Sequence, residues 1–299
     1  MTSSTTSTSP VAQFFEITSK YPALTVGLTI FTFFLYIIDD FFLSFYLAHK
    51  FSLSPQSIGE FDLNRVSFYI LYHKNILHWL FNVVTLFTPL AIFERNHGTV
   101  HTGITLNLLA VVTAIQYTIV GLFLYPDTSV IGLSGIAFSF LSYLAFNESK
   151  LRKTIHLFHY NNRDYTIPTL YTPVITLFLC LILIPGSSFF GHLFGLTSGY
   201  LLSFGYIKFL YPPPKVVLFI ENKLSGAIAK LDGLVIFYKE EDNHREISYT
   251  SHFDKDLELG SFFNSLTSST GITATSTSTT TAAATEQTTF RGDGHVLGA

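Results

Sequence analysis

Six long apolar stretches between residues 22 and 210 constrain this chain more than any other feature of its sequence. Each is close to the ~20 residues that a helix needs to cross a bilayer. They lie at about 22–44, 76–94, 102–124, 130–147, 166–184 and 188–210. Only 12% of the residues are charged, whereas ~25% is usual in soluble domains. The sequence therefore predicts an all-α polytopic membrane protein with six spanning helices.

The charge and the cysteine content exclude several classes of function. The formal net charge is −3, so nucleic acid is not an expected partner. The single cysteine, Cys180, cannot form an internal disulfide or a cysteine-based zinc cluster, and we expect it to be an inert core residue. The chain has no His-Glu-x-x-His motif, so a zinc protease of that type is not expected, and no metal or organic cofactor is implied.

The basic residues of the short loops predict how the chain is oriented. The loop between the fourth and fifth apolar stretches holds Lys150, Arg152, Lys153 and Arg163, whereas the loops at 125–129 and 185–187 hold no basic residue. Because basic loops favour the cytosol, we expect both termini on that side. The second, fourth and sixth helices then start from the lumenal or outer face.

The chain divides by composition into a membrane core and a tail. We expect a disordered N-terminus, a six-helix core, a cytosolic membrane-proximal segment, a Ser/Thr/Ala-rich linker and a docking motif, at residues 1–20, 21–212, 213–260, 261–289 and 290–299. Within the membrane-proximal segment, Val216–Ile220 and Leu234–Tyr238 fit strands or parts of a helix that lies on the membrane. The sequence leaves both alternatives open.

Polar side chains near the outer ends of three predicted helices are functional candidates, because such groups are costly in a bilayer. The second helix carries His73, His78 and Asn82, the fourth carries Gly132-Leu-Ser134-Gly135, and the sixth carries Gly191-His192 with Gly195 and Gly199. We expect Ser134 and His192 each to lie about four residues into a helix, which is roughly 6 Å below the same membrane face. The topology thus predicts that they meet at one depth.

These residue types suit hydrolysis of a peptide bond. A serine hydroxyl is a weak nucleophile, and His192 can activate Ser134 by taking its proton. The Asn82 amide, the His78 ring and the backbone N–H of Ser134 can stabilise the resulting oxyanion. Glycines allow helices to approach closely, and they occur here at 135, 191, 195 and 199. Each motif alone is weak, and the prediction rests on their combination.

The combined motifs resemble the rhomboid family of intramembrane serine proteases, and most of all the fungal Golgi-type rhomboids. The residues that carry the resemblance are Arg65, His73, His78-Trp-Leu-Phe-Asn82, Glu94-Arg95, Gly98, Gly132-Leu-Ser134-Gly135, Gly191-His192, Gly195 and Gly199. It covers about residues 20–210 and implies a six-helix core with a Ser–His dyad.

By this resemblance Ser134 is the nucleophile and His192 the base. His78 and Asn82 line the oxyanion site with the Gly132 and Gly135 backbone, and His73 and Arg65 are supporting positions. The chain departs from the family twice. Asn64 stands where Trp is frequent, and Phe138 stands where Tyr often stacks on the histidine. Neither departure removes a reacting group.

The last ten residues are similar to an SHP box, the peptide that binds the N-domain of the hexameric AAA segregase valosin-containing protein. The matching positions are Phe290, Gly292, Gly294 and Leu297. Phe290 and Leu297 can serve as apolar anchors, and the glycines allow a bent backbone between them. The linker before them would span about 30 Å, so the motif can reach a cytosolic partner.

Other classes of membrane protein remain alternatives. A rhomboid-like pseudoprotease would deliver membrane substrates to the segregase without cutting them, but inactive members usually lack the serine or the histidine. An aspartyl protease needs carboxyls on two helices, and adjacent Asp39 and Asp40 cannot face each other. A channel predicts polar groups along the whole path.

We expect a protease of single-pass membrane proteins in the Golgi or endoplasmic reticulum. We also expect His97 and His101 to lie at the surface.

Overall fold

The computed structural model describes residues 21–160, 163–184 and 186–240. The predicted linker, the docking motif and residues 1–20 lie outside the described residues. The helices are α2 (Ala23–Leu43), α3 (Tyr46–Phe51), α4 (Leu63–Phe68), α5 (Ile76–His97), α6 (Thr99–Leu124), α7 (Ser134–Leu151), α8 (Thr172–Leu183), α9 (Phe189–Ser203) and α10 (Pro214–Leu231). Short 3₁₀ turns, η1 (Tyr69–Leu71), η2 (Thr169–Tyr171) and η3 (Lys208–Leu210), join them.

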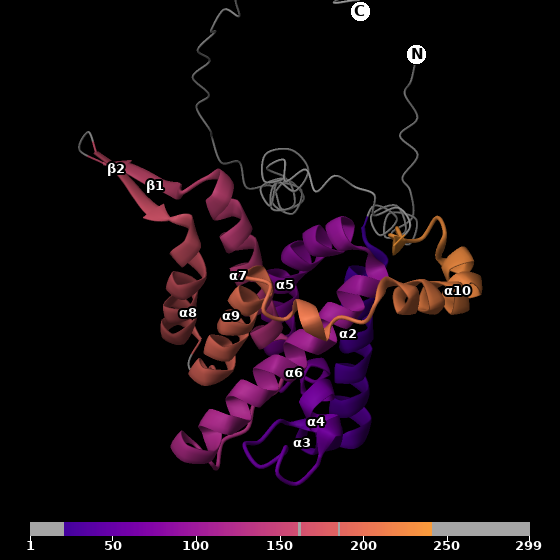
Figure 1. Ribbon diagram of the computed structural model, residues 1–299. Helices are drawn as coiled ribbons and strands as arrows, with labels where there is room; N and C mark the ends of the chain where they lie inside the picture. Colours follow the sequence, from indigo (N-terminus) through magenta and orange to yellow (C-terminus); the bar gives the residue numbers. More distant parts are fainter. Residues whose placement is uncertain (1–20, 161–162, 185, 241–299) are drawn as a thin grey trace, which may run out of the picture. The chain divides into compact units, whose positions relative to one another are not determined.

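The prediction of an all-α membrane fold is confirmed, and each apolar stretch contains one helix (Figure 1). Three of these helices, α2, α5 and α6, are long and apolar enough to cross a membrane. The others are shorter: α7 has 18 residues, α8 has 12 and α9 has 15. At 1.5 Å per residue, α8 is only about 18 Å long, which is shorter than the predicted span 166–184.

Local backbone chemistry explains the short helices. The predicted span 188–210 ends early because Gly205 adopts φ +84° and stops α9 at Ser203. The Tyr206 N–H then donates to the Leu201 carbonyl and the Gly205 N–H to the Leu202 carbonyl, which is a Schellman-type end. The predicted start of the fifth helix at residue 166 is also wrong, because that residue belongs to a strand.

The loop between α7 and α8 forms a hairpin that the sequence analysis missed. Strand β1 (Thr154–Tyr160) pairs antiparallel with β2 (Arg163–Pro168), with an irregular register between His156 and Phe158. The described side chains of β2 are almost all exposed, so this strand buries no apolar face against the bundle. It adds a small sheet outside the helical bundle and does not change the fold class.

Helix α7 is the centre of the bundle, and α9 packs closest to it. Two glycines of α9 make this contact: a Cβ on Gly195 would overlap the backbone of Gly135, and one on Gly199 would overlap the backbone of Ser139. The Ser139 hydroxyl donates a 2.7 Å hydrogen bond to the Gly195 carbonyl across the interface. Small residues therefore bring the two backbones together, as the glycine spacing predicted.

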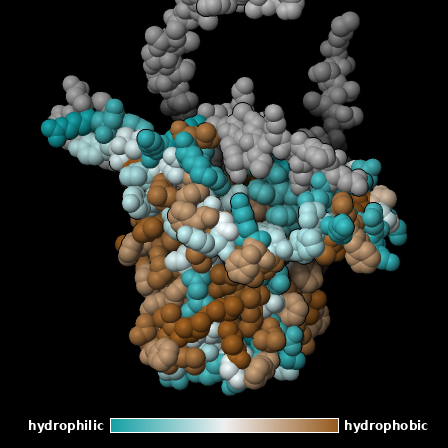
Figure 2. Space-filling model, in the orientation of Figure 1, coloured by the Kyte–Doolittle hydropathy of each residue, from teal (hydrophilic) through white to brown (hydrophobic). Residues whose placement is uncertain are grey.

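Apolar side chains cover much of the outer surface of the bundle. Figure 2 shows them as a broad area over the helices, with polar residues gathered toward the hairpin and α10. Phe31, Phe34, Phe41 and Phe42 of α2 are exposed, as is Phe123 of α6. A water-facing surface would not carry so many exposed aromatic side chains, and a lipid-facing surface would.

The membrane-proximal segment bonds to the starts of two helices. Val216–Ile220 lies within α10, so the helical alternative holds there. Leu234–Tyr238 contributes backbone hydrogen bonds and no continuous strand: the Ile236 carbonyl accepts from Ala23 N–H at 2.8 Å, and the Tyr238 carbonyl accepts from Thr99 N–H at 2.8 Å. The segment thus satisfies the first N–H groups of α2 and α6.

Two histidines predicted to lie at the surface, His97 and His101, are half-buried. The His97 ring stacks on Phe93 with centroids 4.0 Å apart, and its Nε2 lies 3.2 Å from the Tyr143 hydroxyl. His101 stacks on Tyr211 at 4.6 Å. The expectation that they lie at the surface is wrong in part, because side chains from α5, α7 and the segment after α9 contact the two rings.

Candidate active site

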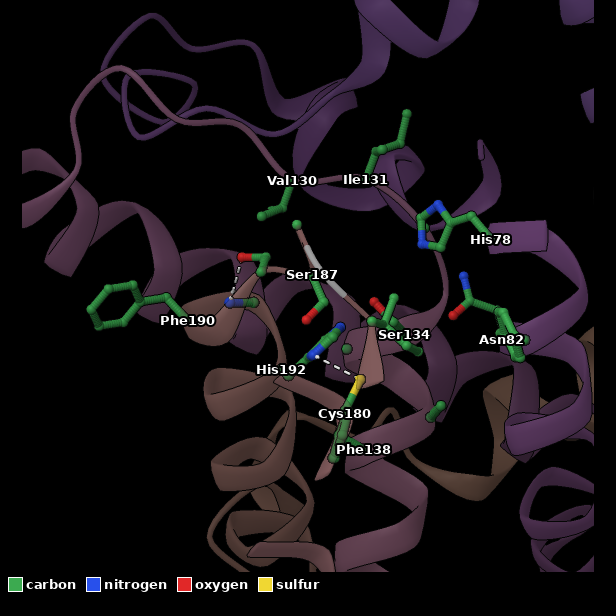
Figure 3. A pocket seen from close by; sticks show the side chains of 18 of the residues that line it. His78, Asn82, Val130, Ile131, Ser134, Phe138, Cys180, Ser187, Phe190 and His192 are labelled. Carbon is green, nitrogen blue, oxygen red and sulfur yellow. Dashed lines mark hydrogen bonds between the residues drawn. The ribbon is translucent and has the colours of Figure 1, made fainter. Parts of the chain in front are cut away.

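A cavity of about 960 Å³ lies where α5, α7, α8 and α9 meet near one end of the bundle. Side chains and backbone from all four helices and from the loop before α7 line it (Figure 3). The sequence-predicted residues among its walls are His78, Asn82, Gly132, Ser134, Gly135 and His192. Residues from distant parts of the chain therefore line one cavity.

Ser134 is the first residue of α7 and not the fourth of its helix, as the sequence analysis expected. The residues before it form a loop that backbone hydrogen bonds hold at two points. Val130 exchanges two backbone hydrogen bonds of 2.9 Å with Leu53, and the Gly132 N–H donates to the Tyr69 carbonyl at 2.9 Å. Because Ser134 opens the helix, its own N–H has no acceptor within α7 and is available to the cavity.

His192 is the fourth residue of α9, where the sequence placed it. The Ser188 side chain caps this helix by accepting from the Gly191 N–H at 3.1 Å. The Phe138 ring stacks on the imidazole with centroids 4.8 Å apart and an interplanar angle of 29°. The phenyl group at position 138 therefore still supports the histidine ring without a hydroxyl.

The close packing of α7 on α9 brings Ser134 and His192 to adjacent positions in the cavity wall (Figure 3). A Cβ on Gly135 would lie 3.3 Å from the Gly191 carbonyl, so these two helix starts are in near contact. His192 is 6% exposed, which keeps the imidazole largely out of lipid and water. The structure thus places a hydroxyl beside a buried imidazole, as a nucleophile and its base require.

Asn82 and His78 face the loop that precedes Ser134. A Cβ on Gly132 would lie 2.9 Å from His78 Nε2 and 3.1 Å from Asn82 Nδ2, and Gly132 itself has φ +107°. Only glycine fits this conformation and this space. The Asn82 side chain is 3% exposed, and its Nδ2 has no hydrogen-bond partner within the described residues. A buried amide donor without a partner is the kind of group that a transient oxyanion can satisfy.

His73 and Arg65 lie outside the cavity wall. His73 precedes α5 and is 1% exposed, and its ring lies 5.3 Å from the His78 ring in an edge-on contact. Burial, followed by the neighbouring His78, lowers the pKa of His73 to about 3, so the ring is neutral. Arg65 donates to Asp62 at 2.7 Å and to the Ser52 carbonyl at 3.3 Å, which holds the first loop together.

Two residues of the cavity wall were not identified as candidates from the sequence. Cys180 on α8 is half-buried, so the expectation of a core residue is not met, and it lines the cavity with its Sγ 3.9 Å from His192 Nδ1. Ser187, in the turn before α9, lines the same wall. No sequence signal marked either residue, because each sits among ordinary apolar or loop residues and matters only through its neighbours in space.

The described residues contain no group of three or more His, Cys, Asp or Glu side chains that could hold a metal ion. The cavity offers a hydroxyl, imidazoles and an amide, which suit acyl transfer. The predicted partner-binding residues Phe290, Gly292, Gly294 and Leu297 lie beyond the part of the chain that the structure describes.

Comparison with known proteins identifies relatives along nearly the whole chain. Residues 60–209 match the rhomboid domain family. The chain is 52% identical over 283 residues to the rhomboid-type serine protease 2 of Debaryomyces hansenii, which covers 94% of this chain and 93% of that protein. The proteins of the same description from Candida albicans and Saccharomyces cerevisiae are 50% and 39% identical, over 80% and 76% of this chain and 85% of each of those proteins.

Proposed function

The chain belongs to the rhomboid family, and from that premise we propose that Ser134 and His192 are the catalytic dyad with which it cleaves membrane-spanning proteins. It is a rhomboid-type serine endopeptidase. The observation that carries the assignment of residues is the shared cavity, in which Ser134, His192 and the unpartnered amide of Asn82 face one another (Figure 3).

The reaction follows from these groups. His192 accepts the proton of the Ser134 hydroxyl while the oxygen attacks the substrate carbonyl carbon. The negative charge that forms on the carbonyl oxygen is stabilised by the Asn82 amide, the His78 ring and the Ser134 N–H. His192 then gives its proton to the leaving amine, which breaks the peptide bond and leaves an acyl-enzyme. A water molecule, deprotonated by His192, hydrolyses that ester and restores Ser134.

The residues that line the cavity indicate how the substrate helix and water reach it. Leu77 and Phe81 of α5 and Leu179 and Leu183 of α8 line it and are also exposed on the apolar surface, so a substrate helix can approach from lipid between these helices. At the outer end, the wall contains exposed polar residues such as Lys74, from which water can enter. Because helical carbonyls are already hydrogen-bonded, the substrate must unwind locally, and we expect small residues, Gly and Pro to favour cleavage.

A direct test co-expresses the full chain with a single-pass reporter protein and follows its fragments. Ser134→Ala and His192→Ala should each abolish cleavage without loss of folded protein. Ser149→Ala is the matched control, since Ser149 lies at the far end of α7 and donates to the Phe146 carbonyl at 2.7 Å. Cleavage that persists in Ser134→Ala would remove the assignment of the nucleophile.

The rival pseudoprotease makes a different prediction for the same experiment. It would hold the reporter without producing fragments, and Ser134→Ala would behave like the wild type. The presence of both Ser134 and His192 in one cavity supports cleavage over mere holding, because neither group is needed for a docking role.

We further propose that the tail recruits an AAA segregase of the valosin-containing type through Phe290, Gly292, Gly294 and Leu297. The support is the spacing of these residues and the long polar linker before them. Phe290→Ala with Leu297→Ala should abolish co-purification of the segregase, whereas Thr288→Ala, just outside the motif, should not. Unchanged co-purification of the double variant would end this proposal.

The protein is integral to a membrane, and we propose a Golgi or endoplasmic reticulum location with both termini in the cytosol. Lys150, Arg152 and Lys153 at the end of α7 support this orientation. Glycosylation acceptor sites inserted at residue 127 and at residue 232 test it: only the first should be modified. Modification of the second would reverse the proposed topology.

A further inference from the structure

The imidazole of His192 has a neighbour besides Phe138 and Ser134. The Cys180 side chain approaches from α8, and its Sγ lies 3.9 Å from Nδ1 (Figure 3). The remainder of the ring turns toward Ser134 in the same view. Among the described residues that line the cavity, none is Asp or Glu, so no carboxylate reaches this nitrogen from the wall.

We propose that Cys180 is a positioning residue for the catalytic base. Its sulfur accepts the Nδ1–H of His192, which keeps Nε2 unprotonated and directed at the Ser134 hydroxyl. This inference rests on the dyad proposed above and adds a third member to it. The contact fixes both the tautomer and the rotation of the ring, while Phe138 fixes the plane in which the ring lies.

The tautomer matters because a neutral imidazole carries one proton on two nitrogens. If the proton sat on Nε2, that nitrogen could not accept the proton of Ser134. A carboxylate usually selects the correct tautomer in serine hydrolases, but an ionised carboxylate is costly against lipid. A thiol sulfur is a weak, polarizable acceptor that carries no charge, so it can sit beside the apolar residues of α8.

The simpler alternative is that Cys180 only fills space. It packs beside Leu177 and Leu196, which belong to the same apolar cluster as Phe138. The two roles predict opposite responses to substitution. Valine preserves volume and removes the acceptor, whereas serine preserves an acceptor and loses apolar packing.

The experiment uses the full chain, purified and reconstituted in vesicles with a fluorogenic transmembrane substrate. Cys180→Val should lower kcat about fivefold with an unchanged KM, as expected for the loss of one weak hydrogen bond. Cys180→Ser should stay within about twofold of the wild type. Leu177→Ala is the packing control and should lower thermal stability with kcat retained in the folded fraction.

A wild-type kcat in Cys180→Val, or an equal fall in Cys180→Ser, would overturn the inference. If Cys180→Val does not fold, Cys180→Ala takes its place, with the same expected loss and the same contrary outcome. The two proposals fail separately. An active Ser134→Ala would sink the dyad, whereas an inactive Ser134→Ala with fully active cysteine variants would sink only the role of Cys180.

A second readout uses the fact that Cys180 is the only cysteine in the chain. N-ethylmaleimide can form a thioether only there, with the sulfur adding to the double bond and the thiol proton passing to the adjacent carbon. Wild type labelled to completion, as verified by mass, should lose cleavage, while treated Cys180→Ser should keep it. Full labelling with unchanged turnover would contradict the proposal.

Discussion

Asn82 and Glu94 lie on the same helix, α5, and are buried to a similar degree, but their surroundings differ completely. Glu94 accepts four hydrogen bonds of 2.8 Å, from the Leu24 and Thr25 N–H groups and from the Thr25 and Thr99 hydroxyls. The side-chain nitrogen of Asn82 has no partner in the described part of the chain. The buried polar group near the end of α5 therefore has hydrogen-bond partners, whereas the side-chain nitrogen near its start has none among the described residues.

This difference separates structural from functional polar residues in a membrane protein. A buried carboxylate is tolerated when donors surround it, and Glu94 joins the starts of α2 and α6 to the end of α5. An unpartnered donor costs stability, and it remains useful only if something else binds it. We therefore interpret the Glu94 end as the scaffold and the Asn82 end as the reaction site.

The largest effect is expected at the contact between α7 and α9, which brings Ser134 and His192 into the wall of one cavity. Gly195→Val should prevent α9 from approaching α7, because a Cβ there would overlap the Gly135 backbone. We expect loss of both folded protein and cleavage, measured by detergent size-exclusion yield and by reporter fragments. Gly27→Ala is the control: it lies in α2 with nothing near its Cβ position and should stabilise the protein by about 1 kcal/mol.

Substitution of Glu94, at the hydrogen-bonded end of α5, should lower the stability of the protein more than its rate of cleavage. Glu94→Ala leaves four neutral donors without an acceptor, and a single buried donor left unpaired costs about 1–3 kcal/mol, so we expect a loss of at least that size in the free energy of unfolding. Turnover per folded molecule should change little. Thermal unfolding with activity normalised to folded protein measures both quantities, and a selective loss of turnover at unchanged stability would break the comparison.

Substitution of Asn82, near the start of α5, should lower the rate of cleavage more than the stability of the protein. Asn82→Ala removes an oxyanion donor and should lower kcat about 10²–10³-fold, with stability unchanged or slightly higher. Steady-state kinetics on the fluorogenic substrate, next to a melting curve, provide the test. A destabilised protein with normal kcat would mean that the Asn82 amide is structural.

The smallest effect concerns pH at the reaction end. Burial lowers the pKa of His73 to about 3, whereas an unfolded histidine titrates near 6.5. Between these values the unfolded state binds more protons, so the His73 contribution is fully present above about pH 6.5 and is lost as pH falls toward 3. Melting temperatures measured from pH 7 to pH 4 should fall less steeply in His73→Gln than in wild type. Equal slopes would mean that His73 is not buried as a neutral ring.

The sequence predicted the dyad because three polar motifs recur near one end of apolar helices. It could not give the exact depth of Ser134, since the pinned loop at Val130 and Gly132 depends on contacts with Leu53 and Tyr69. It also missed the hairpin after α7, whose second strand carries almost only exposed side chains. The partial burial of His97 was not predicted either, because it depends on contacts such as that with Tyr143 of another helix.

By itself the amino-acid sequence determined that this chain spans a membrane and which residue types can react. Hydrophobicity, glycine spacing and the identity of Ser134 and His192 are local properties, and they are visible without any fold. Only the tertiary structure decided which buried polar groups have hydrogen-bond partners and which lack them, as for Glu94 and Asn82, and that Cys180 faces His192. Hydrogen bonds between distant segments depend on where the helices pack, and no single segment encodes that arrangement.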